Sequence, residues 1–380
     1  MRIVSFTAPL HRQFGGPPVA VSGIVASLSD LGNDMKLIVC GQTVADSNQN
    51  SQFFDKVTNS GAQVSVIQRR KESIYGAFLR FNELKTIYRD IAEADIVILH
   101  QVYQLQYCSI APILLMMKKP YVVMPHGTLT TYQRNQHKFR KFVFAPFTYM
   151  LLKFSKAIFV ATEQENSQLP RYLKEMGINV GLGVELPLQK FQGKIHSTPI
   201  FKILYMGRIT KKKRLDIALQ AFALAAKKSK IQMRFIVCGS GEEAELAEVK
   251  KLVGTLQIEN DVDFRGWVDF SEKHSALAES DCFILTSEDE NFAIAAAEAL
   301  AHGIPCILSA NVALASLVTK YSAGIVFQEL NPIEIEEAII KISLTDRELS
   351  RHSSLLAASK LNWDVIGPKW ELTLKALLRV

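Results

Sequence analysis

Short apolar runs of strand length recur along the chain, and several are separated by stretches with the periodicity of amphipathic helices. Strands that alternate with helices predict a parallel sheet whose faces are covered by the helices. The alternation occurs twice, on either side of a segment without clear periodicity. We therefore predict an α/β protein with two Rossmann-like domains, and 380 residues are enough for each domain to bury its own core.

The predicted strands fall into two groups of similar plan. They cover 3–6, 36–40, 64–67, 96–100, 121–125 and 157–161 in the first half, and 202–206, 234–238, 261–264, 282–286, 305–308 and 324–326 in the second. Helical periodicity covers 19–31, 78–94, 214–228, 242–256, 271–279 and 333–341.

The composition is that of a soluble globular protein, with 48% hydrophobic and 21% charged residues. Five scattered cysteines without metal-ligand spacing predict reduced, largely buried thiols in a cytosolic protein. The N-terminus enters a predicted strand directly, without signal-peptide architecture, and no apolar run approaches the roughly 20 residues that span a bilayer.

The net charge of +7 is unevenly distributed. Residues 1–190 hold 21 Lys and Arg against 13 Asp and Glu, whereas residues 191–380 hold 23 against 24. The first half is therefore basic and the second nearly neutral, which suggests that the first half faces an anionic partner.

The stretch from Ser287 to Pro305 carries two carboxylates, Glu290 and Glu298, eight positions apart with small apolar residues between them. The preceding apolar run predicts a buried strand, and the alanines predict a helix that starts near Asn291. A helix that begins at the carboxyl end of a strand offers backbone N–H groups to a phosphate. Glu298 would lie inside that helix among alanines, where an unpaired carboxylate is costly. An ordinary strand–turn–helix with an exposed cap remains the alternative.

The spacing of Glu290 and Glu298, followed by Ala299–Pro305, resembles the nucleotide-sugar signature of family-4 retaining glycosyltransferases of group 1, which have the GT-B fold. The resemblance implies two Rossmann-like domains that face each other across a cleft, with a C-terminal helix crossing back to the first domain. The expected domains are 1–185 with the C-terminal helix 364–380, a linker 186–199, and 200–363 as the nucleotide-sugar-binding domain.

In the second domain, the resemblance assigns most of the donor site. Arg208 and Lys213 would clamp the diphosphate, because the leaving group gains negative charge as the glycosidic bond breaks. A solvated basic loop before a helix is the alternative for these cations. The remaining expected donor contacts are Glu290 to sugar hydroxyls, Glu298 to the ribose, the backbone of Asn291, Phe292 and Ala293 to phosphate, and the backbone near Val268 to the base.

In the first domain, Gly15 and Gly16 resemble the flexible glycine loop of the family beside the donor phosphate, although a plain strand-to-helix turn is equally consistent with the residues. His126, within Pro125–Gly127, resembles the histidine that contacts the donor sugar near the reaction centre, and is expected to be catalytic with Glu290. By itself, a lone histidine more often has a structural role. Glu165 fits a recurring motif and is expected to orient or line the cleft.

Two features depart from the family pattern, and two further motifs are weak signals. Ala293 stands where the family commonly has glycine, so the backbone is more restricted and a methyl group lies near the sugar. The loop 311–316 lacks a common acidic residue. Gly239 and Gly241 predict a tight turn under the nucleotide, and the pair Asp261 and Asp263 is not expected to bind metal.

The expected activity is retaining transfer of a hexose from a UDP- or GDP-sugar to a hydroxyl of a glycan or lipid-linked acceptor, of the bacterial polysaccharide type. Neither a metal nor another cofactor is expected, and no nucleic-acid partner. The expected location is cytoplasmic, with peripheral association at the inner membrane face through the basic, aromatic segment 134–156. The alternatives are an epimerase-like or phosphorylase-like enzyme, or an inactive subunit that binds nucleotide or glycan.

Overall fold

The computed structural model describes residues 1–11, 15–42, 51–68, 79–136, 138–187 and 200–379, with only the backbone for residues 51 and 138–144. The chain divides into two compact units. The first contains Met1–Gly183 and Trp363–Val380, and the second contains Val184–Asn362. Most of the expected linker, residues 188–199, lies outside the described residues.

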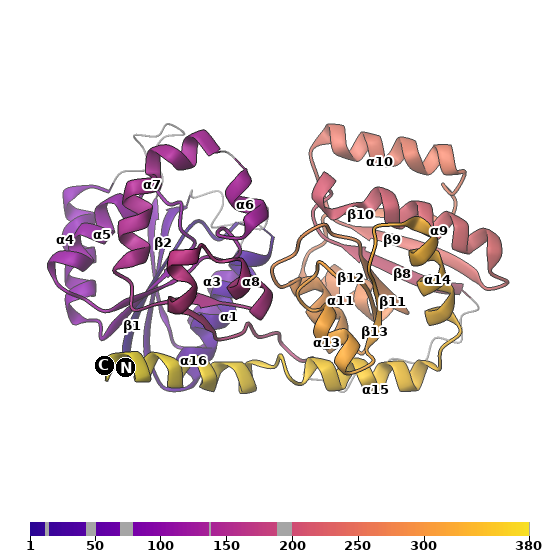
Figure 1. Ribbon diagram of the computed structural model, residues 1–380. Coiled ribbons are helices and arrows are strands. Elements are labelled where there is room, and N and C mark those ends of the chain that lie inside the picture. Colours follow the sequence, from indigo (N-terminus) through magenta and orange to yellow (C-terminus); the bar gives the residue numbers. More distant parts are fainter. Residues whose placement is uncertain (12–14, 43–50, 69–78, 137, 188–199, 380) are drawn as a thin grey trace. The chain divides into compact units, whose positions relative to one another are not determined.

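Within the described residues, the first unit is built on a parallel sheet of seven strands in the order β3-β2-β1-β4-β5-β6-β7 (Figure 1). The central strands are buried apolar runs, as expected when helices cover both faces of a sheet. The strands are β1 (Arg2–Thr7), β2 (Asp34–Gln42), β3 (Gln63–Gln68), β4 (Ile96–His100), β5 (Tyr121–Met124), β6 (Ala157–Val160) and β7 (Gly177–Asn179).

The helices of the first unit form two groups around this sheet. Helix α1 packs against α3 and α16, and α4 packs against α5. Their bounds are α1 (Gly16–Asp30), α3 (Ser51–Asn59), α4 (Phe81–Glu93), α5 (Tyr107–Met116), α6 (Thr131–Asn135), α7 (Lys138–Lys153), α8 (Glu163–Gln168), the 3-10 helix η3 (Arg171–Met176) and α16 (Trp363–Leu378).

The second unit repeats the plan with six described parallel strands in the order β10-β9-β8-β11-β12-β13 (Figure 1). The order reverses at β8, so the loops that follow β8 and β11 leave the same edge of the sheet next to each other. The strands are β8 (Ile200–Met206), β9 (Gln232–Cys238), β10 (Val262–Gly266), β11 (Cys282–Leu285), β12 (Cys306–Ser309) and β13 (Gly324–Phe327).

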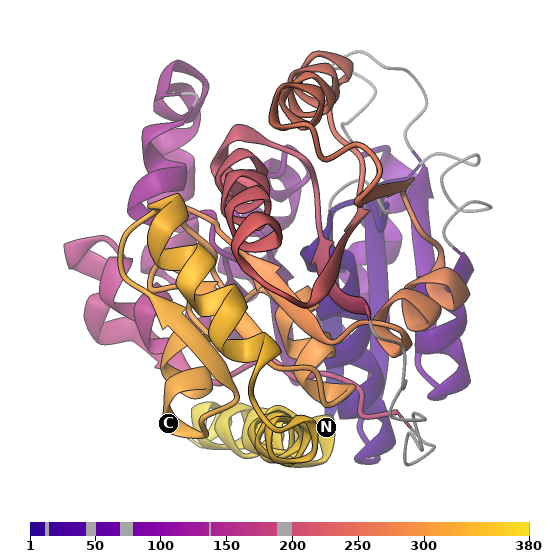
Figure 2. The ribbon, with the colours of Figure 1, turned by 90° about the vertical axis from the view of Figure 1, so that its right-hand side faces the viewer.

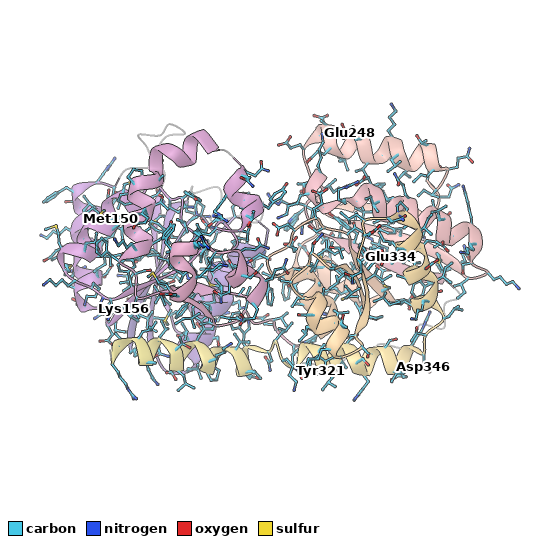
Figure 3. All side chains as sticks on the ribbon, viewed as in Figure 1. Met150, Lys156, Glu248, Tyr321, Glu334 and Asp346 are labelled. Atoms are coloured by element: carbon cyan, nitrogen blue, oxygen red, sulfur yellow. The ribbon has the colours of Figure 1, made fainter. Side chains whose placement is uncertain are left out.

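Helices also cover both faces of the second sheet (Figures 1 and 2). Helix α9 packs against α10 and α14, and α12 packs against α15. Asp346, labelled in Figure 3, caps α15, and its side chain accepts a hydrogen bond from the Leu349 amide at 2.8 Å. The bounds are η4 (Lys211–Lys213), α9 (Leu215–Lys228), α10 (Glu243–Leu256), α11 (Phe270–Ala278), α12 (Ile294–Ala301), α13 (Ala315–Lys320), α14 (Pro332–Ser343) and α15 (Arg347–Ala358).

Helix α16 completes the first unit, which confirms the prediction that the C-terminal helix returns to the first domain. The Trp363 ring packs on Gly23 and Gly183, where an added Cβ would lie 2.4 and 2.3 Å from ring atoms. Trp370 is fully buried, packs edge-on against Phe159 and donates a 3.1 Å hydrogen bond to the Gly181 carbonyl. The two tryptophans therefore hold α16 against the sheet and α1.

The predicted alternation is confirmed, with local differences. The sequence missed β7, a half-buried run of three residues. Helix α12 starts at Ile294 rather than near Asn291. The five cysteines are free thiols and all except Cys108 are buried, as predicted. In the part of the chain that the structure describes, no helix is both long and apolar enough to cross a bilayer.

Candidate active site

Two loops at the carboxyl edge of the second sheet are joined by hydrogen bonds. One, the basic loop, follows β8 and contains η4. The other, the acidic loop, runs from β11 to α12. The Thr286 hydroxyl donates to the Arg214 carbonyl at 2.7 Å, and the Glu288 amide donates to the Lys212 carbonyl at 2.9 Å. These contacts fix the basic loop against the acidic loop.

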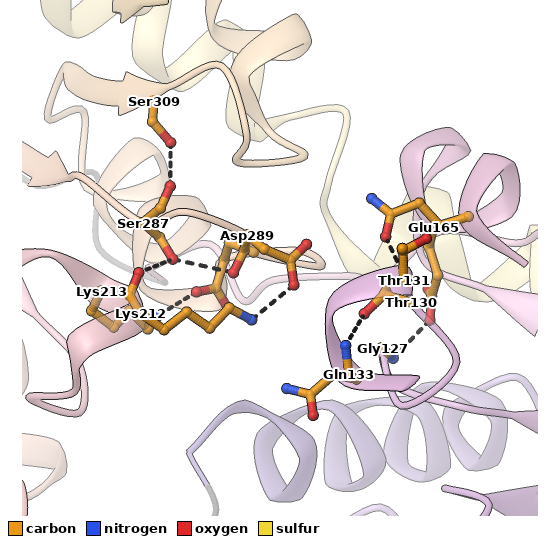
Figure 4. A network of polar contacts seen from close by, with 12 residues as sticks. Gly127, Thr130, Thr131, Gln133, Glu165, Lys212, Lys213, Ser287, Asp289 and Ser309 are labelled. Atoms are coloured by element: carbon orange, nitrogen blue, oxygen red, sulfur yellow. Dashed lines mark hydrogen bonds and ion pairs between the residues drawn. The ribbon is translucent and has the colours of Figure 1, made fainter. Parts of the chain in front are cut away.

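Three ion pairs connect the same loops. Lys213 pairs with Glu290, Lys212 pairs with Asp289 at 2.9 Å (Figure 4), and Arg214 pairs with Glu288 at 3.1 Å. The side chains of Lys213 and Glu290 are only 18% and 21% exposed, so their attraction is less screened by water than that of a surface pair. The structure thus brings together two predicted site residues, a cation and a carboxylate.

The acidic loop is also held from its other side (Figure 4). The Ser309 hydroxyl donates to the Ser287 carbonyl at 2.6 Å, and the Ser287 hydroxyl donates to the Lys212 and Asp289 carbonyls. Glu290 forms an isolated parallel bridge with Val312. The backbone of Glu290 is therefore fixed by loops that follow three neighbouring strands, a form of preorganisation that site residues require.

Ala293 explains why α12 begins three residues later than predicted. Its φ and ψ of 67° and 64° are left-handed, and it forms the N-cap of α12. Alanine is a good helix former, so helix propensity alone places this residue inside the predicted helix. Phe292 and Ala293 are both 5% exposed, and Asn291 is half-buried.

Ala293→Gly is expected to stabilise the second unit, because glycine adopts the left-handed conformation without the steric cost that alanine bears. The expected gain is about 1 kcal/mol in the free energy of unfolding. Thermal denaturation of the two proteins measures it. Ala295→Gly, inside α12, is the matched control and should destabilise the unit by a similar amount. A lower melting temperature for Ala293→Gly would contradict the prediction.

Glu298 lies in the middle of α12 and has a partner that the sequence did not suggest. Its carboxylate accepts from the Lys273 ammonium at 2.6 Å, and both side chains are at most 20% exposed. Lys273 comes from α11, which precedes β11. The carboxylate among alanines is therefore paired, which resolves the cost expected for an isolated charge.

The other donor residues of the second unit lie on the same loops or the next one. Arg208 is exposed in the loop after β8, and in the described part of the chain it forms no ion pair. Val268 is half-buried in the turn between β10 and α11. All of these loops leave the carboxyl edge of the sheet, where open α/β sheets bind ligands.

Gly239 and Gly241 serve close packing of the backbone. A Cβ at Gly239 would lie 1.8 Å from the Gly207 carbonyl oxygen, and one at Gly241 would lie 2.3 Å from that of Ile209. The Ile209 amide donates to the Ser240 carbonyl at 2.9 Å. The glycine pair therefore supports the loop that carries Arg208.

In the first unit, Gly15 has a φ of 70° and forms the N-cap of α1, which begins at Gly16. His126 follows β5 with a left-handed φ of 52°, and burial lowers its pKa to about 4. The imidazole is therefore neutral at physiological pH.

Glu165 orients the turn that carries His126. Its buried carboxylate accepts from the Gly127 amide at 2.7 Å (Figure 4) and also from the Ala161 amide at 2.8 Å. The sequence analysis expected Glu165 either to orient neighbouring groups or to line the cleft, and these contacts agree with the first of these roles. Sequence reasoning missed His100, at the end of β4, whose Nδ1 lies 2.9 Å from Nε2 of His126.

Among the described residues, no group of three or more His, Cys, Asp or Glu is arranged to bind a metal ion. Asp263 instead pairs with Arg265 at 2.9 Å.

Comparison with known proteins finds similarity to glycosyltransferases. The family model of glycosyl transferases group 1 matches residues 189–354. A GDP-mannose:cellobiosyl-diphosphopolyprenol alpha-mannosyltransferase from Xanthomonas oryzae is 23% identical over 97% of this chain and 95% of its own length. An N-acetyl-alpha-D-glucosaminyl L-malate synthase from Bacillus anthracis is 28% identical over 40% of this chain and 38% of its own length.

Solved structures share the complete fold. Anabaena Alr3699/HepE, in complex with UDP and glucose, has a TM-score of 0.77 at 16% identity and covers 99% of this chain and 100% of its own. Sucrose-phosphate synthase from Thermosynechococcus elongatus has a TM-score of 0.73 at 16% identity, over 100% and 99%. The fold is therefore GT-B, with one Rossmann-like domain in each unit. The family match over residues 189–354 and the relative that spans 97% of this chain agree with this fold.

Proposed function

We propose that the chain transfers a hexose from a UDP- or GDP-sugar to a hydroxyl of a glycan or lipid-linked acceptor, with retention of anomeric configuration. The observation that carries this proposal is the paired Lys213 and Glu290 at the carboxyl edge of the second sheet, with Glu298 on the adjoining helix. Relatives support the substrate classes, since one is named for GDP-mannose and a diphosphopolyprenol acceptor and the Anabaena structure contains UDP and glucose.

The residues have distinct proposed roles. Arg208 and Lys213 bind the diphosphate with the backbone of Asn291, Phe292 and Ala293, while Glu298 accepts from the ribose hydroxyls. Glu290 accepts from sugar hydroxyls, and Val268 contacts the base through its backbone. In the first unit, Gly15 and Gly16 are proposed to contact the donor phosphate and His126 the sugar. These cations carry the positive charge that the leaving group requires, so the proposal includes no divalent metal.

The proposed reaction is a same-face displacement. The acceptor oxygen forms a bond to the anomeric carbon as the bond from that carbon to the phosphate oxygen breaks. The departing phosphate oxygen takes the proton of the acceptor hydroxyl. No protein nucleophile is needed for this step, and the positive charge of Lys213 stabilises the departing diphosphate.

Nucleotide binding and donor hydrolysis test the proposal. UDP or GDP should raise the melting temperature more than ADP, since a ligand that binds only the folded state at 100 times its Kd stabilises it by about 2.7 kcal/mol. Slow release of nucleoside diphosphate from the donor without acceptor would separate an enzyme from an inactive nucleotide-binding subunit. No stabilisation by any of the three nucleotides would contradict the proposal.

Glu298→Gln is expected to weaken nucleotide binding by roughly 1.5–3 kcal/mol, because the amide keeps the shape but loses the charge-assisted hydrogen bonds to the ribose. Isothermal titration with the stabilising nucleotide measures the loss. Lys273→Met is the matched control, because it breaks the same ion pair but keeps the carboxylate. Equal losses in both variants would mean that the pair has only a structural role and that Glu298 does not bind the ribose.

We also propose that the first unit associates with an anionic membrane surface through the segment 134–156. The side chains of 137–144 lie outside the described residues, but Tyr149 and Phe154 are 43% and 57% exposed, and the Lys153 ammonium lies 5.5 Å from the Tyr149 ring centre. Cations near an anionic bilayer contribute about 1 kcal/mol each. The alternative is that the aromatic side chains belong to the core of the unit.

Co-sedimentation with vesicles that contain anionic lipid is expected at low salt and should weaken as salt rises. Lys138→Glu combined with Lys141→Glu should reduce it. Lys227→Glu with Lys230→Glu, exposed positions in the second unit, is the control with the same change in charge. Equally weak binding to anionic and neutral vesicles at low salt would contradict the proposed membrane association.

A further inference from the structure

A hydrogen-bonded chain of three side chains runs from inside the first sheet to His126. Ser5 lies on β1, His100 ends the neighbouring strand β4, and His126 follows β5. The Ser5 Oγ lies 2.9 Å from His100 Nε2, and His100 Nδ1 lies 2.9 Å from His126 Nε2. Ser5 and His100 are fully buried, whereas the His126 side chain is half-buried. Only the far end of this chain can therefore reach a ligand.

The protons in this chain can be arranged in two ways. In the first, the Ser5 hydroxyl donates to His100 Nε2, and His100 Nδ1–H donates to His126 Nε2. In the second, every donor is reversed, and His126 Nε2–H donates inward. Each neutral imidazole has one donor and one acceptor nitrogen, so the direction chosen at Ser5 sets the tautomer of both rings.

The Ser5 hydroxyl decides between the two arrangements. Among the described residues, His100 Nε2 is its hydrogen-bond partner and no other is present. In the reversed arrangement the hydroxyl would only accept, and its own hydrogen would be buried without an acceptor. A buried donor left without an acceptor bears the full penalty of losing its hydration. The first arrangement satisfies every hydrogen in the chain.

We propose that Ser5 and His100 are positioning residues that hold His126 in the Nδ1–H tautomer, so that it presents a neutral hydrogen-bond donor to a hydroxyl oxygen of the donor sugar. This inference rests on the proposed function, which places His126 against the sugar.

Two further contacts keep this group in place, and burial keeps it neutral. The Tyr107 hydroxyl donates to the His100 carbonyl at 2.5 Å, and Glu165 holds the Gly127 amide next to His126. Burial lowers the pKa of His126 to about 4 and that of His100 well below its ordinary value. A neutral donor at Nδ1 can bind a sugar oxygen without adding positive charge at that position.

Nitrogen NMR of the full chain labelled with 15N-histidine tests the tautomer directly, whether or not the proposed activity is correct. His126→Gln and His100→Asn assign the two rings among the eight histidines. The expected result is that Nδ1 is protonated and Nε2 is not, in both rings. A protonated Nε2 in His126 would overturn the proposal.

Kinetics test the positioning role. His100→Phe keeps a planar aromatic ring but removes both hydrogen bonds, and should lower kcat about tenfold with unchanged nucleotide affinity. His100→Asn places an amide N–H close to the position of Nδ1 and should recover most of that loss. Ser5→Ala, which allows both tautomers, should lower kcat only about two- to threefold and give NMR signals of a mixture. Equal loss of kcat in His100→Asn and His100→Phe would overturn the positioning role. If His100→Phe does not fold, the kcat of Ser5→Ala and the tautomers seen by NMR decide the question.

Discussion

Lys213→Met should lower kcat/KM for hexosyl transfer by roughly a thousandfold, the upper range for loss of one charge-stabilising donor. The substitution removes the cation proposed to bind the diphosphate. It also leaves the Glu290 carboxylate, 21% exposed, without its counter-charge at the place where negative charge develops. Steady-state kinetics with the preferred donor measures the effect, and titration with the nucleotide measures the accompanying loss of affinity.

The same short helix provides matched controls for this prediction. The Lys211 side chain is exposed, and its backbone amide donates a 3.1 Å hydrogen bond to the Glu245 carboxylate, so Lys211→Met should leave kcat/KM almost unchanged. Lys212→Met breaks the pair with Asp289 and should have an intermediate effect through the loop. Activity of Lys213→Met within about threefold of Lys211→Met would exclude Lys213 from a role in the reaction.

Gly239→Ala should destabilise the second unit by about 4 kcal/mol or more, the range of severe backbone clashes. The added Cβ would lie 1.8 Å from the Gly207 carbonyl oxygen, and both atoms belong to backbone segments held in place by β8 and β9. For a unit of this size, such a loss lowers the melting temperature by about 8–16 °C.

Scanning calorimetry of the purified chain measures this change. Gly254→Ala, inside α10, is the control, because its Cβ would meet its nearest neighbour at an ordinary 3.5 Å. Alanine should there raise stability by up to about 1 kcal/mol. A melting temperature of Gly239→Ala within about 2 °C of the original protein would mean that the Gly207 loop can move aside at little cost.

The sequence predicted most of the fold because buried parallel strands appear as continuous apolar runs. Ile96–His100 is such a run and its predicted bounds are those of β4. The edge strand β7 was missed because Gly177–Asn179 is short and half-buried, without an apolar run. The start of α12 was wrong because Ala293 takes a left-handed conformation that its helix propensity opposes.

The candidate site was predicted in part. The two loops of the second unit could be located because each follows a recognisable strand and carries charged residues. The pairing of Lys273 with Glu298 and the chain from Ser5 to His126 could not be predicted, because both depend on which strands and helices become neighbours. His100 had no signal of its own, since it looked like the last residue of a buried strand.

Helix α16 determines the order in which the two units can be completed during protein synthesis. The second unit is continuous in sequence, so all of its residues have been made before α16 is translated. The first sheet is made earlier, but the surface over Gly23 and Gly183 has no Trp363 to cover it until α16 arrives. At 5–20 residues per second, translation of the intervening unit takes about 10–40 s. The unit that leaves the ribosome first is therefore the last to be finished, and it carries uncovered apolar surface during that interval.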